Sequence, residues 1–321
     1  MPEDIFRVII MKKSVLFCLV AATLSFMTNC SKPDEPNNEN GNSGGNNNSG
    51  GNNQTLAGTL IGVFSVSDYK QVQFSKGNLQ YNGSSRTWKF AENQWGILGD
   101  NGQGGNSPTV MRDLFGWGTS GWDSGATEYQ PYATSSISSD YSPGGSSTTD
   151  LVNSYANADW GVYNPIQNGG NAQNKWRTLT ANEWEFLFNT RYTTSHIRYA
   201  MAVVNNIKGV ILVPDDWDAS TYDLNNTNNS NYQALFYDNV ISSEDWKNTL
   251  EPHGAVFLPA AGYRIGLLGV SGQEGYYWST THFNANKAFA LRFNYENGLN
   301  VNAHSDRCIG YAVRLVHDVN K

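Results

Sequence analysis

The chain has 321 residues, and 21 lysines and arginines against 28 aspartates and glutamates give it a formal net charge of −7. Charged residues make up 15% of the sequence, compared with about 25% in an ordinary soluble domain, whereas aromatic residues reach 13%. A chain so rich in aromatic residues can bury a large core, which excludes disorder throughout, and the lack of a basic excess argues against nucleic-acid binding.

The N-terminal segment is predicted to be a secretion signal. Lys12 and Lys13 precede an apolar run, Val15–Met27, that is shorter than the roughly 20 residues a helix needs to cross a bilayer. A short apolar run behind positive charges is typical of a secretory signal peptide. Because Met11 is a natural start, residues 1–29 are interpreted as an upstream extension followed by the signal peptide. A buried core helix is the alternative.

The next segment, residues 30–56, resembles the start of a mature bacterial lipoprotein. Cys30 comes after the apolar run and before a tract of Asn, Gly and Ser that has no hydrophobic period. In lipoproteins such a cysteine becomes the lipidated first residue, although Asn29 stands here where a small residue is usual. The Ser-Lys-Pro-Asp-Glu run after Cys30 also resembles the export tag of surface lipoproteins in the Bacteroides group. The resemblance implies a lipid anchor at Cys30, a flexible tether, and outward display from the outer membrane, which the protein contacts only through its anchor.

Cysteine content limits the chemistry of the remaining chain, residues 57–321. Cys18 would leave with the signal and Cys30 is the expected lipidation site, so Cys308 is the one cysteine left. This part of the chain therefore cannot form an intramolecular disulfide or a metal site that needs a cysteine pair. No second linker interrupts residues 57–321, which are predicted to form a single domain.

The first half of this domain is predicted to consist of strands and loops. Strand-like patterns separated by turns at Ser67-Asp68 and Asn82-Gly83 indicate four strands, at 59–66, 70–75, 77–81 and 87–90. Two stretches rich in Gly lack a regular period. They are predicted to be an ordered, aromatic-rich loop and a long surface loop, at 114–122 and 133–149.

Two short helices are predicted in the middle of the domain. Thr180 and Glu183 fit a capping box, and an apolar stripe follows at Trp184, Leu187 and Phe188. A second cap of the same spacing is predicted to begin a helix that ends near a glycine. Its markers are Ser242, Asp245, Trp246 and Gly254.

The last third of the chain returns to strand patterns. The predicted strands lie at 254–264, 275–281, 288–295 and 310–319. In the third of them Phe289, Leu291 and Phe293 alternate with Ala290, Arg292 and Asn294, so one face is expected to be buried and the other exposed.

Several blocks of this sequence resemble known families. WRTLTANEWEFLFNTR (176–191) is similar to the helix motif of formylglycine-generating-enzyme-type domains. AVFLPAAGYR (255–264) and the later GYYWSTT, AFALRFN and GYAVRLV blocks resemble the C-terminal core of the Fibrobacter major paralogous domain family. The resemblance implies an α+β, C-type lectin-like fold with a small mixed, mainly antiparallel sheet, two short helices and extensive loops. It also implies a ligand face built from the last strands and loops.

The polar segment near the C-terminus suggests a more specific relationship. It lies between YYWS at 276–279 and GYAVRLV at 310–316 and is dense in Asn, His, Ser, Asp and Tyr. This layout resembles the variable proteins of diversity-generating retroelements, in which copying at template adenines randomises a C-terminal stretch of a fixed scaffold. An ordinary hairpin with a polar face explains the protein sequence equally well.

No catalytic centre is predicted. Enzymes of the formylglycine-generating type use a pair of active-site cysteines, and a lone Cys308 is more typical of a partly buried small residue. The run His304-Ser305-Asp306 does not make a hydrolase triad because adjacent residues rarely face one another, and no Gly-x-Ser-x-Gly elbow is present. No two histidines have the spacing of a zinc site. A structural calcium ion remains possible at one of two oxygen-rich runs, Asp215, Asp216 and Asp218, or Asp100 and Asn101.

The predicted interior and the predicted contact surface separate clearly along the chain. Trp184, Trp246 and Trp278 are expected in the core, and Arg314 is expected to be a buried guanidinium that ties loops together. The predicted contact residues are short or planar polar groups, for which plain solvated surface is the alternative interpretation. They are His282, Asn284, Asn286, Arg292, Asn294, Asn302, His304, Asp306 and Arg307.

Such side chains form adaptable hydrogen bonds at low entropic cost, as they do in antibody paratopes. The sequence therefore predicts a non-enzymatic cell-surface lipoprotein, without a resident cofactor, whose C-terminal face (about 280–308) binds a protein or glycan ligand. The alternatives are a formylglycine-generating-type enzyme and a structural envelope or fimbria-associated subunit.

Overall fold

The computed structural model describes residues 56–99, 107–127, 130–231, 235–270, 272–294 and 297–319. These residues belong to one compact unit, Asn53–Lys321. The predicted signal peptide, the lipidation site Cys30, nearly all of the tether, and the pair Asp100 and Asn101 lie outside the described residues. Within the described ranges, no helix is both long enough and apolar enough to cross a membrane.

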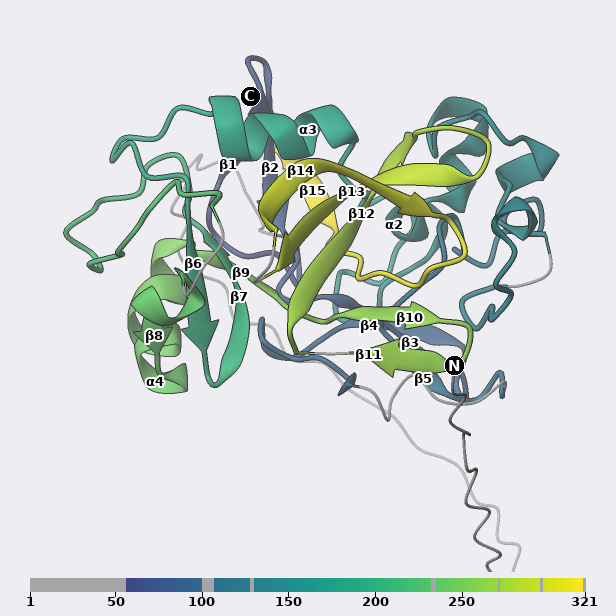
Figure 1. The fold of residues 1–321 in the computed structure, drawn as a ribbon, viewed down its shortest axis with the longest axis horizontal. Coiled ribbons are helices and arrows are strands. Elements are labelled where there is room, and N and C mark those ends of the chain that lie inside the picture. Colours follow the sequence, from purple (N-terminus) through teal and green to yellow (C-terminus); the bar gives the residue numbers. More distant parts are fainter. Residues whose placement is uncertain are drawn as a thin grey trace, which may run out of the picture. The chain divides into compact units, whose positions relative to one another are not determined.

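The fold belongs to the α+β class, with short helices and several small sheets whose strands are mainly antiparallel (Figure 1). One sheet joins the two ends of the described chain, in the order β1 (Phe64–Ser67), β2 (Lys70–Phe74) and β15 (Val316–Val319). A second sheet has the order β4 (Thr87–Phe90), β3 (Leu79–Asn82) and β5 (Met111–Arg112). The four strands predicted between residues 59 and 90 are confirmed, although the first covers only the end of its predicted range.

The third sheet was predicted only through its last strand, which lies within the predicted strand at 254–264. Its order is β8 (Val240–Ile241), β6 (Tyr199–Val204), β7 (Ile207–Leu212) and β9 (Val256–Pro259), and the pair β6–β8 is parallel. A turn at Asn205 and Asn206 connects β6 to β7, and both asparagines have positive φ angles, of 48° and 64°. Hairpin turns of this kind favour asparagine. The alternating pattern that marks an exposed strand is missing because both faces of β6 are covered by apolar side chains.

The C-terminal strands form a separate sheet. Its order is β12 (Glu274–His282), β13 (Lys287–Asn294) and β14 (Gly298–Asp306), and both pairings are antiparallel. A short hairpin, β10 (Tyr263–Ile265) and β11 (Leu268–Val270), precedes it. The predicted strand at 310–319 is regular only at its end, because Gly310, Tyr311 and Ala312 make isolated bridges to three different segments, at Arg264, Phe115 and Tyr277.

The two predicted helices are confirmed. Helix α3 (Ala181–Glu185) has the expected capping box between Thr180 and Glu183 and continues as a π-helical turn over Phe186–Thr190. Helix α4 (Ser243–Asp245) is capped by Ser242 and continues through Trp246–Leu250 and Glu251–His253. It ends at Gly254, whose φ of 85° is unfavourable for other residues. A further short helix, α2 (Trp160–Tyr163), follows a 3₁₀ segment, Asn153–Ala158.

The loops predicted at 114–122 and 133–149 contain no strand or α-helix beyond isolated bridges. Two 3₁₀ turns, Ser138–Asp140 and Pro143–Gly145, lie within the second. A third such turn, Leu235–Asp238, precedes β8.

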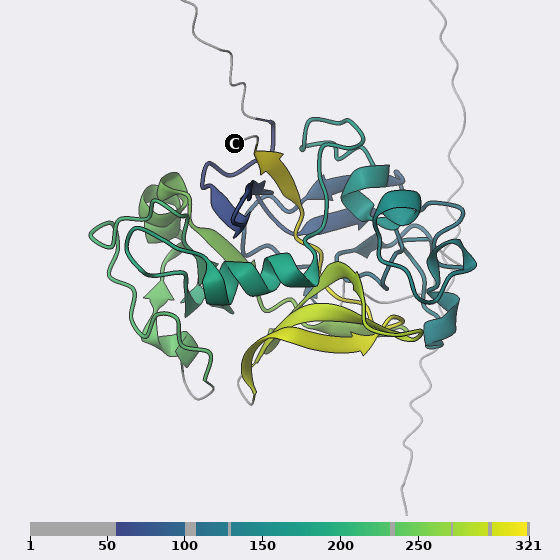
Figure 2. The same ribbon diagram turned by 90° about the horizontal axis from the view of Figure 1, so that it is seen from above.

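Tryptophan and arginine side chains fill the interior. Seven tryptophans are fully buried, and they include Trp184, Trp246 and Trp278, as predicted. Arg314 is also fully buried, which confirms the expectation of an internal guanidinium. Figure 2 shows α3 lying between the C-terminal sheet and the sheet that contains β1 and β2. The apolar face of α3 packs there with Trp184, Leu187 and Phe188, all completely buried.

Candidate functional site

Both faces of the C-terminal sheet take part in the core. Leu291 and Phe293 pack in the cluster that includes α3, whereas Ala288 and Ala290 pack with Trp278 in a second cluster. Successive residues of a strand alternate between the two faces, and directly opposed residues of an antiparallel pair project to the same side. The register therefore places the pairs Lys287–Asp306 and Phe289–His304 on the face of Leu291 and Phe293, and the pair Arg292–Asn300 on the opposite face. We call the C-terminal face the set made of Lys287, Asp306, Phe289, His304, Asn302 and the β12–β13 connection, 282–286.

The exposed end of this face combines ring and amide groups. Asn302 and His304 are exposed on β14. The imidazole ring of His304 stacks on Phe283, with ring centroids 3.9 Å apart and an interplanar angle of 10°, and Phe289 meets His304 edge-on. Lys287 Nζ and Asp306 Oδ1 lie 3.9 Å apart. The pair is half-exposed, so it contributes little stability and both groups remain available to a ligand.

The connection between β12 and β13 is held in shape by its own polar side chains. Asn284 Oδ1 accepts hydrogen bonds from the backbone N–H groups of Asn286 and Lys287, both at 2.9 Å. His282 is fixed by Asp150, whose Oδ1 lies 2.6 Å from His282 Nδ1 and 2.9 Å from the backbone nitrogen of His282. These contacts bring His282, Asn284 and Asn286 to the same end of the sheet as the His304 cluster.

Arg292 lies farther along β13, beside an aromatic stack. It is half-buried and opposes Tyr276 of β12 as well as Asn300 of β14. Tyr276 stacks on Tyr311 with centroids 4.5 Å apart, and its hydroxyl donates to Glu274. Burial, followed by this hydrogen bond, raises the pKa of Tyr276, so it stays a neutral donor at physiological pH.

Two of the predicted contact residues are corrected by the structure. Arg307 is fully buried: its guanidinium carbon lies 4.4 Å from the ring centroid of Trp117, and Nη2 donates to the carbonyls of Ser147 and Asn284 at 2.8 and 2.9 Å. Burial lowers the pKa of Arg307 to about 10. Its five fixed donors suit it to cross-link irregular loops, and that role removes it from the surface.

Asn294 is the second correction. It is only 7% exposed, because its side chain holds the β13–β14 connection. Its Oδ1 accepts from the backbone nitrogen of Asn297 at 2.7 Å, and its Nδ2 donates to Glu274 Oε2 at 3.2 Å.

Sequence reasoning missed the apolar part of this face. Phe283 and Phe289 supply the rings beside His304, and Lys287 and Asn300 complete the cross-strand pairs. The alternation along 288–295 was available as a signal, but the pairing partner of β13 was not, because 298–306 had not been identified as a strand. Asp150, which positions His282, comes from the distant surface loop and left no local signal.

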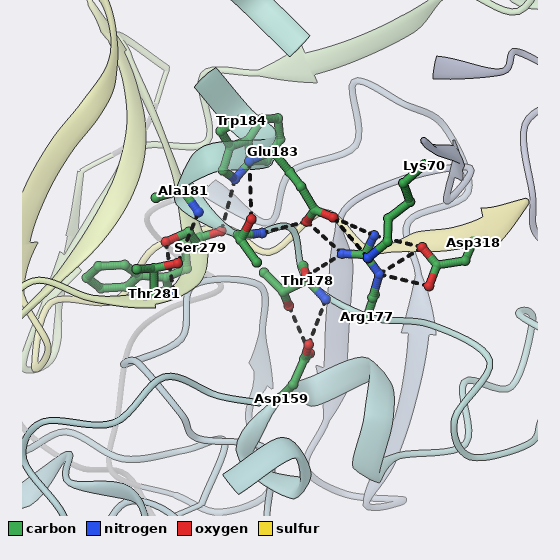
Figure 3. A network of polar contacts seen from close by, with 12 residues as sticks. Lys70, Asp159, Arg177, Thr178, Ala181, Glu183, Trp184, Ser279, Thr281 and Asp318 are labelled. Atoms are coloured by element: carbon green, nitrogen blue, oxygen red, sulfur yellow. Dashed lines mark hydrogen bonds and ion pairs between the residues drawn. The ribbon is translucent and has the colours of Figure 1, made fainter. Parts of the chain in front are cut away.

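The polar network around α3 holds the C-terminal sheet in place (Figure 3). The N-terminus of the helix is tied to β12, because Ala181 N–H donates to Thr281 Oγ1 at 3.1 Å and Trp184 Nε1 donates to the carbonyl of Trp278 at 3.4 Å. The cap residue Glu183 receives a forked pair of hydrogen bonds from Arg177, at 2.7 and 2.8 Å.

Arg177 extends this network to the last strand. It also binds Asp318 of β15, with Nη2 2.7 Å from Oδ1. One guanidinium group therefore links the helix beneath the sheet to the strand that joins both ends of the chain.

Asp159 is the buried acid of the same region. It is 1% exposed, and its carboxylate accepts hydrogen bonds from Gly161 N–H, Thr178 N–H and Thr178 Oγ1 at 3.1, 2.7 and 2.9 Å. Burial raises the pKa of Asp159 to about 6 from 3.8, while the hydrogen bonds from Thr178 and Gly161 oppose the rise.

This shift predicts a pH dependence of stability. Between pH 3.8 and 6 the folded state keeps a proton on Asp159 that the unfolded chain has lost, so this group's contribution to stability falls as the pH rises through that window. Relative to Asp159→Asn, the wild-type protein should lose about 2 kcal/mol of unfolding free energy between pH 4.5 and pH 7.5. Urea denaturation of both proteins at the two pH values measures the difference. A difference that is flat or grows with pH would contradict the assignment.

Within the described residues, no catalytic centre lies beside the thiol of Cys308. Cys308 is buried, 3.5 Å from Ser138 Oγ, and packs with Ala126, Ala133 and Tyr141. In the described ranges no group of three or more His, Cys, Asp or Glu side chains is arranged to hold a metal ion. Of the acidic run considered for calcium, Asp215 is engaged by Arg191 at 2.9 Å and by the backbone nitrogen and hydroxyl of Ser65 at 2.9 and 2.7 Å.

Together, these described residues place rings, amides and a loose ion pair at the exposed end of the sheet. Comparison of the chain with protein-family models, with curated proteins and with solved structures finds no match.

Proposed function

We propose that the protein is a cell-surface lipoprotein that binds a protein or glycan ligand through its C-terminal face. The observation that carries this proposal is the arrangement of Asn302, His304, Phe283 and the Lys287–Asp306 pair at the exposed end of a sheet that packs into the core elsewhere. Side chains with few rotatable bonds lose little entropy on binding, and a rigid sheet avoids the cost of ordering the backbone. The face carries both charge signs, so neutral hydrogen bonds and ring contacts would dominate recognition.

The proposal includes the fold family and the cellular location. A C-type lectin-like fold is supported by the small sheets, the short helices, the long loops and a face built from the last strands. The lipid anchor at Cys30 and display from the outer membrane rest on the resemblance of residues 12–35 to lipoprotein signals. Retroelement diversification remains part of the proposal for the segment between β12 and β15. A reverse transcriptase gene beside a near-copy of its codons that differs at adenines would establish it.

The ligand-binding role can be tested with the full-length protein against two defined sets of probes, a glycan array and a displayed library of extracellular protein domains. We expect saturable binding to a member of one set. The double substitution Asn302→Ala/His304→Ala should raise the Kd at least tenfold, because removing central contacts of an interface typically costs more than about 1.4 kcal/mol.

A matched control keeps this test specific. Asn182 and His253 are exposed on α3 and on the turn after α4, so Asn182→Ala/His253→Ala removes the same groups elsewhere and should leave the Kd unchanged. Failure to bind any member of either set, or equal losses in both double variants, would overturn the proposal. Aldehyde formation on a cysteine-containing peptide that is lost in Cys308→Ala would replace it with the enzymatic alternative.

A further inference from the structure

A groove of about 400 Å³ lies outside the C-terminal face and has a mixed aromatic and polar lining. Three segments that are distant in sequence supply most of its lining: the β3–β4 hairpin, residues 120–123 with 130–132, and the end of α2, with Pro108 beside them. Its volume falls within the range of about 300–1,000 Å³ that is typical of small-molecule sites. Its aromatic side chains are Tyr81, Trp88, Tyr132 and Tyr163, and Arg86 and Asp123 are its charged ones.

The aromatic part of the groove is rigid. Tyr81 and Trp88 are nearly buried, at 6% and 5% exposure, and their ring centroids lie 4.9 Å apart. Tyr132 and Tyr163 are only partly buried. Burial raises the pKa of Tyr81, the neighbouring Tyr132 adds to the shift, and Arg86 opposes it. The groove thus offers flat apolar surfaces edged by hydroxyl groups.

Several polar side-chain groups of the groove do not help to hold the described fold together. Within the part of the chain that the structure describes, the side chains of Arg86, Asp123 and Gln130 form no hydrogen bond or ion pair, and neither do the hydroxyls of Tyr132 and Tyr163. This contrasts with the C-terminal connection, where Asn284 and His282 are already occupied. Arg86 offers only donors, Asp123 only acceptors, and Gln130 both.

We propose that this groove is a second binding site, which takes a neutral oligosaccharide. A pyranose ring has an apolar face of C–H groups that packs against Tyr and Trp rings, and a rim of hydroxyls that each donate and accept hydrogen bonds. A purely apolar ligand would leave Arg86 and Asp123 desolvated without partners, which is costly. A strongly charged ligand would meet one opposing and one like charge at the groove. This inference is independent of the C-terminal face.

The test uses full-length protein and four neutral probes that differ in linkage and substituent: cellohexaose, maltohexaose, mannohexaose and chitohexaose. Titration calorimetry should show saturable binding of at least one probe. Tyr132→Ala and Arg86→Gln should each weaken that binding about tenfold. Tyr192→Ala removes a tyrosine that is 71% exposed and lies outside the groove, so it serves as the matched control and should bind as wild type does.

The outcomes separate this site from the C-terminal face. Asn302→Ala/His304→Ala should leave saccharide binding unchanged if the groove is the site. Absence of binding by all four probes up to about 10 mM, where only interactions weaker than roughly 3 kcal/mol escape detection, would overturn the inference. Equal binding by wild type, Tyr132→Ala and Arg86→Gln would overturn it as well. Circular dichroism of each variant excludes loss of folding as the cause.

Discussion

Replacing Arg314 with leucine is expected to lower the free energy of unfolding by about 3–5 kcal/mol, the cost typical of removing one member of a buried charged network. Arg314 has no exposed surface, and burial lowers its pKa to about 10, so it remains charged at neutral pH. It donates to Asn78 Oδ1, to the carbonyl of Phe257 and to Gln94 Oε1, at 3.4, 3.3 and 3.0 Å. Leucine would fill part of the space but remove all of these hydrogen bonds, and Gln94 Oε1 would keep only the one that it accepts from the backbone nitrogen of Phe257, at 2.7 Å.

The network beyond Arg314 explains why the loss is expected to be large. Gln94 passes the interaction on, because its Nε2 donates to Glu251 Oε2 at 3.0 Å, and the same oxygen accepts from Trp246 Nε1 at 2.9 Å. The arginine and the glutamate are thus coupled through one amide. Urea denaturation measures the change. Lys175→Leu, which removes an exposed cation, should stay within about 0.5 kcal/mol of wild type. A loss below about 1 kcal/mol for Arg314→Leu would show that the network adds little to stability.

Trp278→Ala is expected to destabilise the protein by about 3–5 kcal/mol, the range for removing a large buried aromatic side chain. The ring is completely buried and lies 4.5 Å from the Tyr311 ring, and its Nε1 donates to the carbonyl of Phe115 at 2.7 Å. The side chain therefore joins β12 to two segments outside the C-terminal sheet.

Two companion variants separate packing from hydrogen bonding at this position. Trp278→Phe keeps most of the apolar contact but removes one of the two hydrogen bonds to the Phe115 carbonyl, which still accepts from Tyr311 N–H at 3.0 Å, so its loss should be smaller, about 1–3 kcal/mol. Tyr69→Ala removes a ring that is 88% exposed and should be nearly neutral. Thermal or urea unfolding of the three variants ranks them by their loss of unfolding free energy. A loss in Trp278→Phe as large as in Trp278→Ala would mean that the hydrogen bond, rather than packing, dominates.

Local sequence signals predicted the elements whose cause is local. The capping box at Thr180 and Glu183 appears in the structure because both halves of the motif satisfy backbone N–H groups within one turn. The alternation along β13 correctly predicted a strand, but the expected exposed face is wrong, because Leu291 and Phe293 are buried on one face and Ala288 and Ala290 on the other. Arg314 could be assigned to the interior because a charged residue inside an apolar strand is seldom left facing water.

The features that the sequence did not predict all depend on tertiary contacts. The β6–β7 hairpin is buried on both sides, so the sequences of its strands are apolar runs without the alternation of polar and apolar residues that marks a half-exposed strand. Arg307 and Asn294 look like surface residues from composition. In the structure Arg307 donates to loop carbonyls and Asn294 holds a strand connection, so both side chains are buried. The oligosaccharide groove could not be foreseen, because its lining comes from three segments whose meeting depends on the whole fold.

The sheet β1–β2–β15 has a consequence for how the protein matures. Val316 of β15 pairs with Phe74 of β2, so strands from the two ends of the described chain complete one sheet. Contacts of such long sequence separation form late, after the loop-closure entropy of the intervening chain has been overcome. A polypeptide still emerging from a ribosome or translocation channel lacks the strand that closes this sheet. The sheet would therefore stay incomplete until the final residues were released, and the last step of folding would follow the end of synthesis.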